Sequence, residues 1–176
     1  APVPVRAAAA ARLKESEAIR LLAEPGVPPE VRRAAAGTVR ERDALRKLIL
    51  EDPDPAVRRT AAALVEDAEL LSRLVVEDGD EGVRARAASR LSDQALLERI
   101  ARRDPSPAVR REAVARLKGP DTLAWVLEDP DEGVRAQSVQ SLPGTPDAFA
   151  RTALGDPSPQ VRKYAVGRLL DPPLLD

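Results

Sequence analysis

Residues 51–67 read EDPDPAVRRTAAALVED, and two later stretches repeat this pattern with substitutions. Residues 77–93 read EDGDEGVRARAASRLSD, and residues 103–119 read RDPSPAVRREAVARLKG. Each stretch has an acidic turn, then a Val-Arg dipeptide, then a run of small apolar residues. This recurrence predicts that the chain is built from copies of one structural repeat.

The Val-Arg dipeptide gives the period of the repeat. Successive copies are 26, 26, 26, 26, 25 and 27 residues apart. A period of this size is typical of solenoids, in which each repeat buries its apolar face only against its neighbours. We therefore predict a single repeat domain over residues 1–176. Its repeats are anchored at Val5, Val31, Val57, Val83, Val109, Val134 and Val161.

The residues after each Val-Arg predict a helix with a closely packed apolar face. Val57 is followed four residues later by Ala61 and eight residues later by Val65, a spacing that places all three on one helical face. Asp54 and Pro55 are typical of a helix start, because a short acceptor caps free N–H groups and proline has none to lose. The same capping role is predicted for Asp80, Ser106, Asp131 and Ser158.

A second apolar segment, about two turns long, follows each of these helices. Examples are DAELLSRLVV at residues 67–76 and DQALLERIAR at residues 93–102. The pattern alone does not separate an α-helix from a 3₁₀-helix here. No segment of the sequence has the alternation of a strand bounded by turns. We predict an all-α, right-handed α-solenoid in which each repeat contributes an α-helix and a short second helix.

The composition argues against several classes of site. The chain has no cysteine and no histidine, so it lacks thiolate metal ligands, disulfides and the most common general base. The aspartates of the turns lack the glycine and glutamate spacing of a calcium loop. There is no long apolar run, so neither a signal peptide nor a membrane span is expected. We predict a cytoplasmic protein that is not an enzyme and that needs no cofactor or metal.

The charge balance gives no general preference for nucleic acid or for a membrane surface. The formal net charge is -1, with 32% charged residues, and aromatic residues make up only 2%. Stacking platforms for single-stranded nucleic acid are therefore not expected. The absence of methionine and the 17 prolines fit a thermophilic source, although a GC-rich genome would give the same bias.

The pattern DPDPxVRxxAAxxL…LL, with its period of about 26 residues, resembles the leucine-rich repeat variant family and, more distantly, HEAT-like repeats. The resemblance covers nearly the whole chain and is specific to the repeat, not to any reaction. It implies a right-handed superhelix of alternating α- and 3₁₀-helices without strands. Family members can carry a cysteine-rich iron–sulfur module ahead of the repeats, a feature that this cysteine-free chain cannot share.

The HEAT-like resemblance also implies a ladder in which an aspartate of each turn reaches an arginine on the following helix. The first two repeats depart from it, because Gly26 stands six residues before Arg32 and nothing stands at that distance before Arg6. Two roles are open for the arginines. They tie the turn to the helix and bridge to the next repeat, or they bind an anionic ligand in register. The implied pairs are Asp52–Arg58, Asp78–Arg84, Asp104–Arg110, Asp129–Arg135 and Asp156–Arg162.

A second set of residues points outward and forms the candidate partner-binding surface. The position after the repeated arginine is basic in four repeats, and alanines interrupt this row at Ala7, Ala85 and Ala136. The row is either a solvated face or a groove for an acidic peptide or a phosphate backbone. Trp125 and Phe149 are expected to fill the core or the space between repeats. The candidate residues are Arg33, Arg59, Arg111 and Lys163, with Tyr164 as an aromatic anchor.

The sequence predicts the function only as a class. Extended repeat surfaces bind other macromolecules, so we predict a non-catalytic scaffold for protein–protein interaction. The alternatives are binding of a nucleic-acid phosphate backbone by the basic row, and an enzyme or enzyme subunit that uses the carboxylates of the turns. Residues 7–11 and Leu174–Leu175 are weak caps for a solenoid. We therefore expect either a longer array or self-association through the ends.

Overall fold

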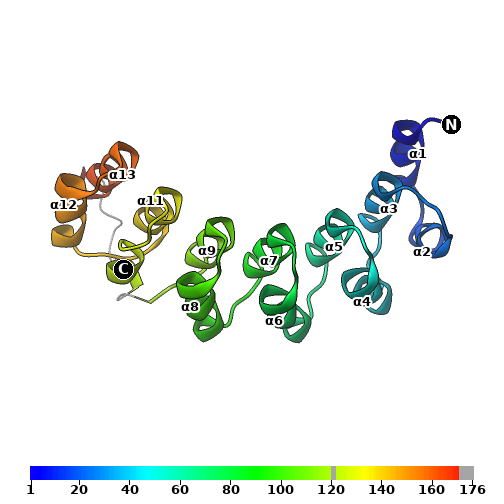
Figure 1. Ribbon diagram of the computed structural model, residues 1–176, viewed down its shortest axis with the longest axis horizontal. Coiled ribbons are helices and arrows are strands. Elements are labelled where there is room, and N and C mark those ends of the chain that lie inside the picture. The colour runs from blue at the N-terminus through cyan, green and yellow to red at the C-terminus, as the bar shows by residue number, and fades with distance from the viewer. Residues whose placement is uncertain (120–121, 171–176) are drawn as a thin grey trace. The chain divides into compact units, whose positions relative to one another are not determined.

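The computed structural model describes residues 1–119 and 122–170, and its regular elements in these ranges are α-helices (Figure 1). The chain forms two compact units, an N-terminal unit at Ala1–Arg90 and a C-terminal unit at Leu91–Asp176. Within each unit the repeats stack on one another, as predicted for an α-solenoid. The assignment of residues 1–176 to a single domain stays a prediction.

Each repeat contributes a first helix, which contains the Val-Arg dipeptide, and a second helix. In the N-terminal unit the first helices are α1 (Val3–Ala10), α3 (Pro29–Ala36), α5 (Pro55–Ala62) and α7 (Glu81–Ala88). The second helices there are α2 (Glu15–Ala23), α4 (Arg42–Glu51) and α6 (Ala68–Glu77). In the C-terminal unit the first helices are α9 (Pro107–Val114), α11 (Glu132–Ser141) and α13 (Pro159–Leu170). The second helices there are α8 (Gln94–Arg103), α10 (Thr122–Val126) and α12 (Pro146–Gly155).

The second helices correct one expectation. Helices α2, α4, α6, α8 and α12 are α-helices of 9 or 10 residues, so the 3₁₀-helices that the family resemblance implies are not found at these positions. Asp67 and Asp93 cap α6 and α8 by accepting from main-chain N–H groups of the first turn. A good cap and a full apolar face favour the α-helix over a 3₁₀-helix, which is rarely sustained over this length.

Five first helices, α1, α3, α5, α7 and α9, have 8 residues each, whereas the first helices α11 and α13 have 10 and 12. In these five repeats the third residue of the predicted apolar stripe therefore lies just beyond the helix. In the second repeat, the N–H of Val39 donates to the carbonyl of Ala36 in a tightened turn, and Val39 is still fully buried. The core is thus continued by the turn and not by the helix.

Within each unit, every first helix packs against the first helix of the neighbouring repeat. In α5, Val57, Ala61 and Ala62 are wholly buried between α3 and α7. Small side chains at these positions allow the helices to approach closely and to exclude water, as native packing density requires. Each second helix packs instead on the first helix that follows it, as α4 packs on α5 through Leu45 and Ile49.

The aromatic residues mark the packing of the second helices in the C-terminal unit. Phe149 of α12 is buried, and the guanidinium of Arg168 lies 4.6 Å from the centre of its ring. Trp125 of α10 is half-buried, and the guanidinium of Arg102 from α8 lies 3.8 Å from its ring centre. The residues predicted to act as weak caps at Leu174–Leu175 lie outside the described residues. Of the described helices, none is long and apolar enough to span a bilayer.

Candidate functional site

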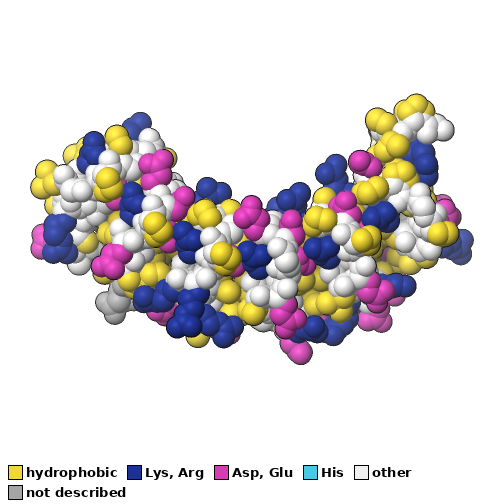
Figure 2. All heavy atoms as spheres, viewed as in Figure 1, with side chains coloured by type: hydrophobic (Ala, Val, Ile, Leu, Met, Phe, Trp, Pro, Cys, Tyr) yellow, Lys and Arg dark blue, Asp and Glu magenta, His cyan; other side chains and the backbone are white. Residues whose placement is uncertain are grey.

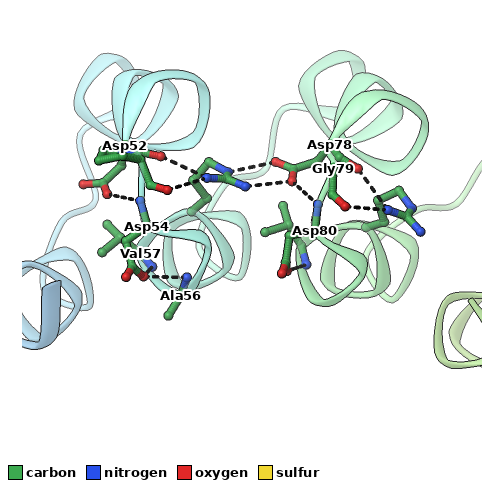
Figure 3. Close-up of polar contacts among 11 residues, drawn as sticks. Asp52, Asp54, Ala56, Val57, Asp78, Gly79 and Asp80 are labelled. Atoms are coloured by element: carbon green, nitrogen blue, oxygen red, sulfur yellow. Dashed lines mark hydrogen bonds and ion pairs between the residues drawn. The ribbon is translucent and has the colours of Figure 1, made fainter.

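A ladder of mostly half-buried arginines and aspartates runs between the turns and the first helices. In the turn before α5, the Asp52 carboxylate accepts from the N–H of Asp54 at 2.9 Å, and Asp78 does the same for Asp80 one repeat later (Figure 3). Aspartate is suited to this local turn because its short side chain reaches the main chain two residues on. The turn therefore orients each carboxylate before the arginine binds it.

The structure corrects the partner of these carboxylates. Nε and Nη2 of Arg58 donate to both oxygens of Asp78, each at 2.9 Å (Figure 3), so the carboxylate binds the arginine of the preceding repeat. The expected contact six residues apart also occurs, but Arg58 Nη1 reaches the main-chain carbonyl of Asp52 there, at 3.1 Å. The equivalent bidentate pairs are Arg32–Asp52, Arg110–Asp129 and Arg135–Asp156.

The other predicted ladder residues show the same main-chain contact. Arg84 Nη1 donates to the carbonyl of Asp78 at 3.0 Å, and Arg110 Nη1 donates to that of Asp104 at 3.0 Å. Arg162 Nη1 donates to the carbonyl of Asp156 at 2.8 Å. Arg32 also belongs to the ladder through its pair with Asp52. Its own turn has no aspartate, and its Nη1 donates to the main-chain carbonyl of Val27.

Burial and hydrogen bonding act in opposite directions on the ladder carboxylates. Burial alone would raise the pKa of the Asp78 carboxyl, but Arg58 and the N–H of Asp80 hold it below the ordinary value of 3.8. Asp156 behaves in the same way, with Arg135 lowering the pKa of its carboxyl. The same hydrogen bonds raise the pKa of the Arg58 and Arg135 guanidinium groups. Both partners are therefore charged at neutral pH.

The ladder is a structural feature and offers little to a ligand. The side chains of Arg110 and Asp129 are only 11% and 10% exposed. Nε, Nη1 and Nη2 of Arg110 all donate to protein oxygens, two of them to Asp129. An anionic ligand would have to displace a carboxylate to bind there. The role that ties the turn and bridges repeats is therefore the one that the geometry favours.

The predicted basic row is exposed, but the structure brings only part of it together. Arg33 and Arg59 lie on α3 and α5, which pack side by side in the N-terminal unit. In the C-terminal unit, Arg111 on α9 and Lys163 on α13 are separated by α11, which carries Ala136 at the equivalent position. Tyr164, next to Lys163, is half-buried and so offers only part of its ring.

Two arginines of the row lie against the start of the next first helix. A Cβ atom added at Gly82 would lie 2.7 Å from Nη1 of Arg59 and 3.1 Å from a carboxylate oxygen of Asp80. At Gly133, the equivalent atom would lie 3.0 Å from the Asp131 carboxylate and 3.8 Å from Nη1 of Arg111. Each arginine thus lies close to the aspartate that caps the next helix.

The structure has grooves between consecutive second helices, which the sequence did not predict. The groove between α2 and α4 has a volume of about 540 Å³, and the one between α4 and α6 about 300 Å³. In the C-terminal unit, the groove between α10 and α12 has a volume of about 720 Å³. All three lie within the size range of small-molecule and side-chain binding pockets.

The three grooves share two features. Ladder residues line each of them: Arg32 and Asp52, then Arg58 and Asp78, then Arg135 and Asp156. Each groove also contains a glutamate at or just after the end of a second helix, namely Glu51, Glu77 or Glu128. The sequence signal for the grooves is weak, because side chains such as Ile19 and Leu22 have the spacing of ordinary core residues.

The fold of this chain is similar to those of solved repeat proteins. A solved leucine-rich repeat variant, described as having a novel repetitive structural motif, matches with a TM-score of 0.71 and 30% sequence identity. The match covers 96% of this chain and 72% of that chain. The chain belongs to the leucine-rich repeat variant family.

A second solved protein has the same fold as this chain but a lower sequence identity to it. The Escherichia coli protein YibA matches with a TM-score of 0.62 at 20% identity, over 91% of this chain and 71% of that chain. No protein-family model and no curated protein matches the chain. The family membership shows a helical repeat protein, and it assigns no reaction and no partner.

Proposed function

We propose that this leucine-rich repeat variant is a non-catalytic scaffold that binds other proteins through the grooves between its second helices. The observation that carries the proposal is the recurrence of one kind of groove between α2 and α4, between α4 and α6, and between α10 and α12. Repeated grooves on extended surfaces are how solenoid proteins bind partners.

Exposed apolar side chains beside the grooves support the proposal. Leu50 of α4 and Val76 of α6 stand at equivalent positions and are 45% and 52% exposed. Leu154 of α12 stands at the same position of its repeat and is 87% exposed. A single exposed leucine needs no explanation, but the same position left apolar and exposed in several repeats is typical of an interaction surface.

The buried ladder supports the proposal in a second way. It lines each groove with hydrogen-bonded residues whose side chains are mostly buried, such as Arg135 and Asp156 at 9% and 5% exposure. A preorganised surface loses less conformational entropy when a partner binds. The ladder therefore contributes to binding by keeping the groove in one shape.

Binding of a phosphate backbone by the basic row has less support. Arg59 and Arg111 lie close to the capping aspartates of the next repeat, so a phosphate would compete with a carboxylate at both positions. Figure 2 shows Lys and Arg side chains interspersed with Asp and Glu over most of the visible face, with one dark-blue cluster at its lower edge. Strong phosphate binding needs several cations without competing acids.

The test compares variants of the two surfaces in affinity capture with extract of the source organism. Ala44→Trp fills the α2/α4 groove and Ala124→Trp fills the α10/α12 groove, whereas Arg33→Glu with Arg59→Glu reverses the basic row. We expect proteins that survive a wash at about 0.5 M salt, where exposed charges are screened, and that are lost with a groove variant. Capture that depends only on the basic row, or nucleic acid retained only at low salt, would overturn the proposal.

A further inference from the structure

The groove between α2 and α4 has an apolar interior that the fold leaves open. Ile19 and Leu22 of α2 face Ala44 and Leu48 of α4 across it. Its lining runs along α4 from Glu41 to Glu51, which is about 15 Å or nearly three turns of helix. That length and interior fit the apolar face of one short helix, a common mode of protein recognition.

The rim of this groove is acidic and not neutralised. Glu41, Asp43 and Glu51 line it, against the single cation Lys47 and the Arg32–Asp52 pair, whose charges cancel. Within the described residues, none of the three acids forms an ion pair. The groove therefore presents negative charge along its α4 side, next to an apolar interior, a pattern that favours a cationic partner.

Glu51 is placed where its own helix disfavours it. It is the last residue of α4 and precedes Asp52, so its carboxylate lies at the negative end of the helix dipole. The equivalent residue of α8 is Arg103, so the repeat accepts a cation at this position. The glutamate of α4 therefore forgoes a favourable helix-end cation and adds negative charge to the groove.

The geometry points to a basic amphipathic α-helix of a partner protein as the occupant of the α2/α4 groove. Apolar side chains spaced i, i+4 would insert beside Leu22 and Leu48, and lysines or arginines of the same helix would face Asp43 and Glu51. This inference rests on the proposed function and specifies the partner chemistry for one groove.

The probe is a synthetic, covalently stapled helix of about three turns, with two leucines spaced i, i+4 and flanked by lysines. A matched peptide carries glutamate in place of each lysine, and a third carries alanine in place of each leucine. Binding to the full chain is measured by fluorescence anisotropy. We expect the basic peptide to bind about tenfold more tightly than either control. Equal binding of the acidic peptide would overturn the inference.

Protein variants locate the binding on the groove. Asp43→Asn with Glu51→Gln removes two rim charges, and the control, Glu66→Gln with Glu69→Gln, makes the same charge change away from it. Glu69 lies in the first turn of α6 as Asp43 does in α4, so these two acids are matched for helix position, and Glu66 lies just before the N-cap of α6. We expect about tenfold weaker binding only for the groove variant, and loss of binding in Ala44→Trp. An equal effect of both charge variants contradicts the assignment.

Two further outcomes separate this inference from the proposed function. Proteins captured from extract and washed at about 0.1 M salt, where rim charges still act, that are lost with Ala44→Trp but kept with Asp43→Asn and Glu51→Gln would leave the scaffold intact and overturn the basic helix. Sedimentation that shows a dimer in the wild-type chain, but not in Ala44→Trp, would assign the groove to a second copy and overturn it too. If none of the captured proteins depends on a groove variant, both proposals fail.

Discussion

Ala61 on the first helix α5 is wholly buried between α3 and α7, whereas Ala44 on the second helix α4 faces an open groove. The two side chains are the same size, so their different burial depends on what the neighbouring repeats place opposite each of them. First helices are held together by small side chains and by the ladder that crosses from repeat to repeat. Second helices pack on the following first helix and keep apart from each other. First helices thus pack tightly against one another, whereas second helices bury side chains such as Ile49 and Leu70 but leave grooves between them.

The largest expected effect comes from breaking the ladder that holds the first helices. Arg110→Ala leaves the Asp129 carboxylate mostly buried without its bidentate partner, and it removes donors to the carbonyls of Asp104 and Pro105. We expect a loss of about 2–3 kcal/mol in the free energy of unfolding, measured by urea denaturation.

The neighbouring residue gives the matched control. Arg111→Ala removes an exposed cation from the same helix, and surface substitutions of this kind change stability by less than about 0.5 kcal/mol. Equal effects of the two alanine variants would show that the ladder does not hold the repeats together.

The next largest effect is expected from a larger side chain placed between first helices, compared with the same change between second helices. Ala61→Leu adds three carbons to a fully packed interface, and we expect a loss of about 2 kcal/mol in unfolding free energy. Ala44→Leu makes the same change in the α2/α4 groove, where the added atoms have space, so we expect a change below about 0.5 kcal/mol. Thermal and urea unfolding of both variants test this difference. Similar losses would mean that the groove is closed in solution.

The pH dependence of stability sharpens the comparison further. The pKa values of Asp78 and Asp156 are lowered in the folded protein, so their contribution is fully present above the ordinary value of 3.8 and is lost as pH falls through the folded pKa. We expect the free energy of unfolding to fall steadily below about pH 4. Arg58→Ala should flatten this decline, because it removes the partner that lowers the pKa of the Asp78 carboxyl. Urea titrations across this range give the answer.

The repeat and the stacking could be predicted because they depend on local sequence. Val57, Ala61 and Val65 recur with the spacing of a helical face, and a helix with such a face must be covered by its neighbours. The ladder partners could not be predicted from spacing. Asp52 stands six residues before Arg58 and twenty after Arg32, and the two spacings add up to one period. Contact within a repeat and contact between repeats are therefore equally consistent with the sequence.

The grooves could not be predicted because they depend on how far apart the second helices lie. That distance is set by packing on the following first helices, and the sequence of α2 or α4 alone does not encode it. Leu22 and Leu48 read as core positions, and only the structure shows that they line a cavity. The outward arginines were predictable as exposed residues, but the aspartates beside them were not, since the approach of Arg59 to Asp80 requires the stacked neighbour.

The smallest effect concerns the caps of the first helices. The Asp54 carboxylate accepts from the N–H groups of Ala56 and Val57, whereas the hydroxyl of Ser106, at the same position before α9, is buried without a hydrogen-bond partner in the described structure. The two turns are otherwise alike, since Asp54 and Ser106 each donate an N–H to the preceding ladder aspartate at 2.9 Å.

Ser106→Asp should therefore transfer the better cap and raise the free energy of unfolding by about 0.5–1 kcal/mol, and Asp54→Ser should lower it by a similar amount. Opposite changes of similar size in urea unfolding would show that the caps of the two turns are interchangeable. No gain from Ser106→Asp would mean that the serine hydroxyl already rotates in solution to cap α9. In that case the difference between the two turns lies in a side-chain rotation and not in the number of satisfied N–H groups.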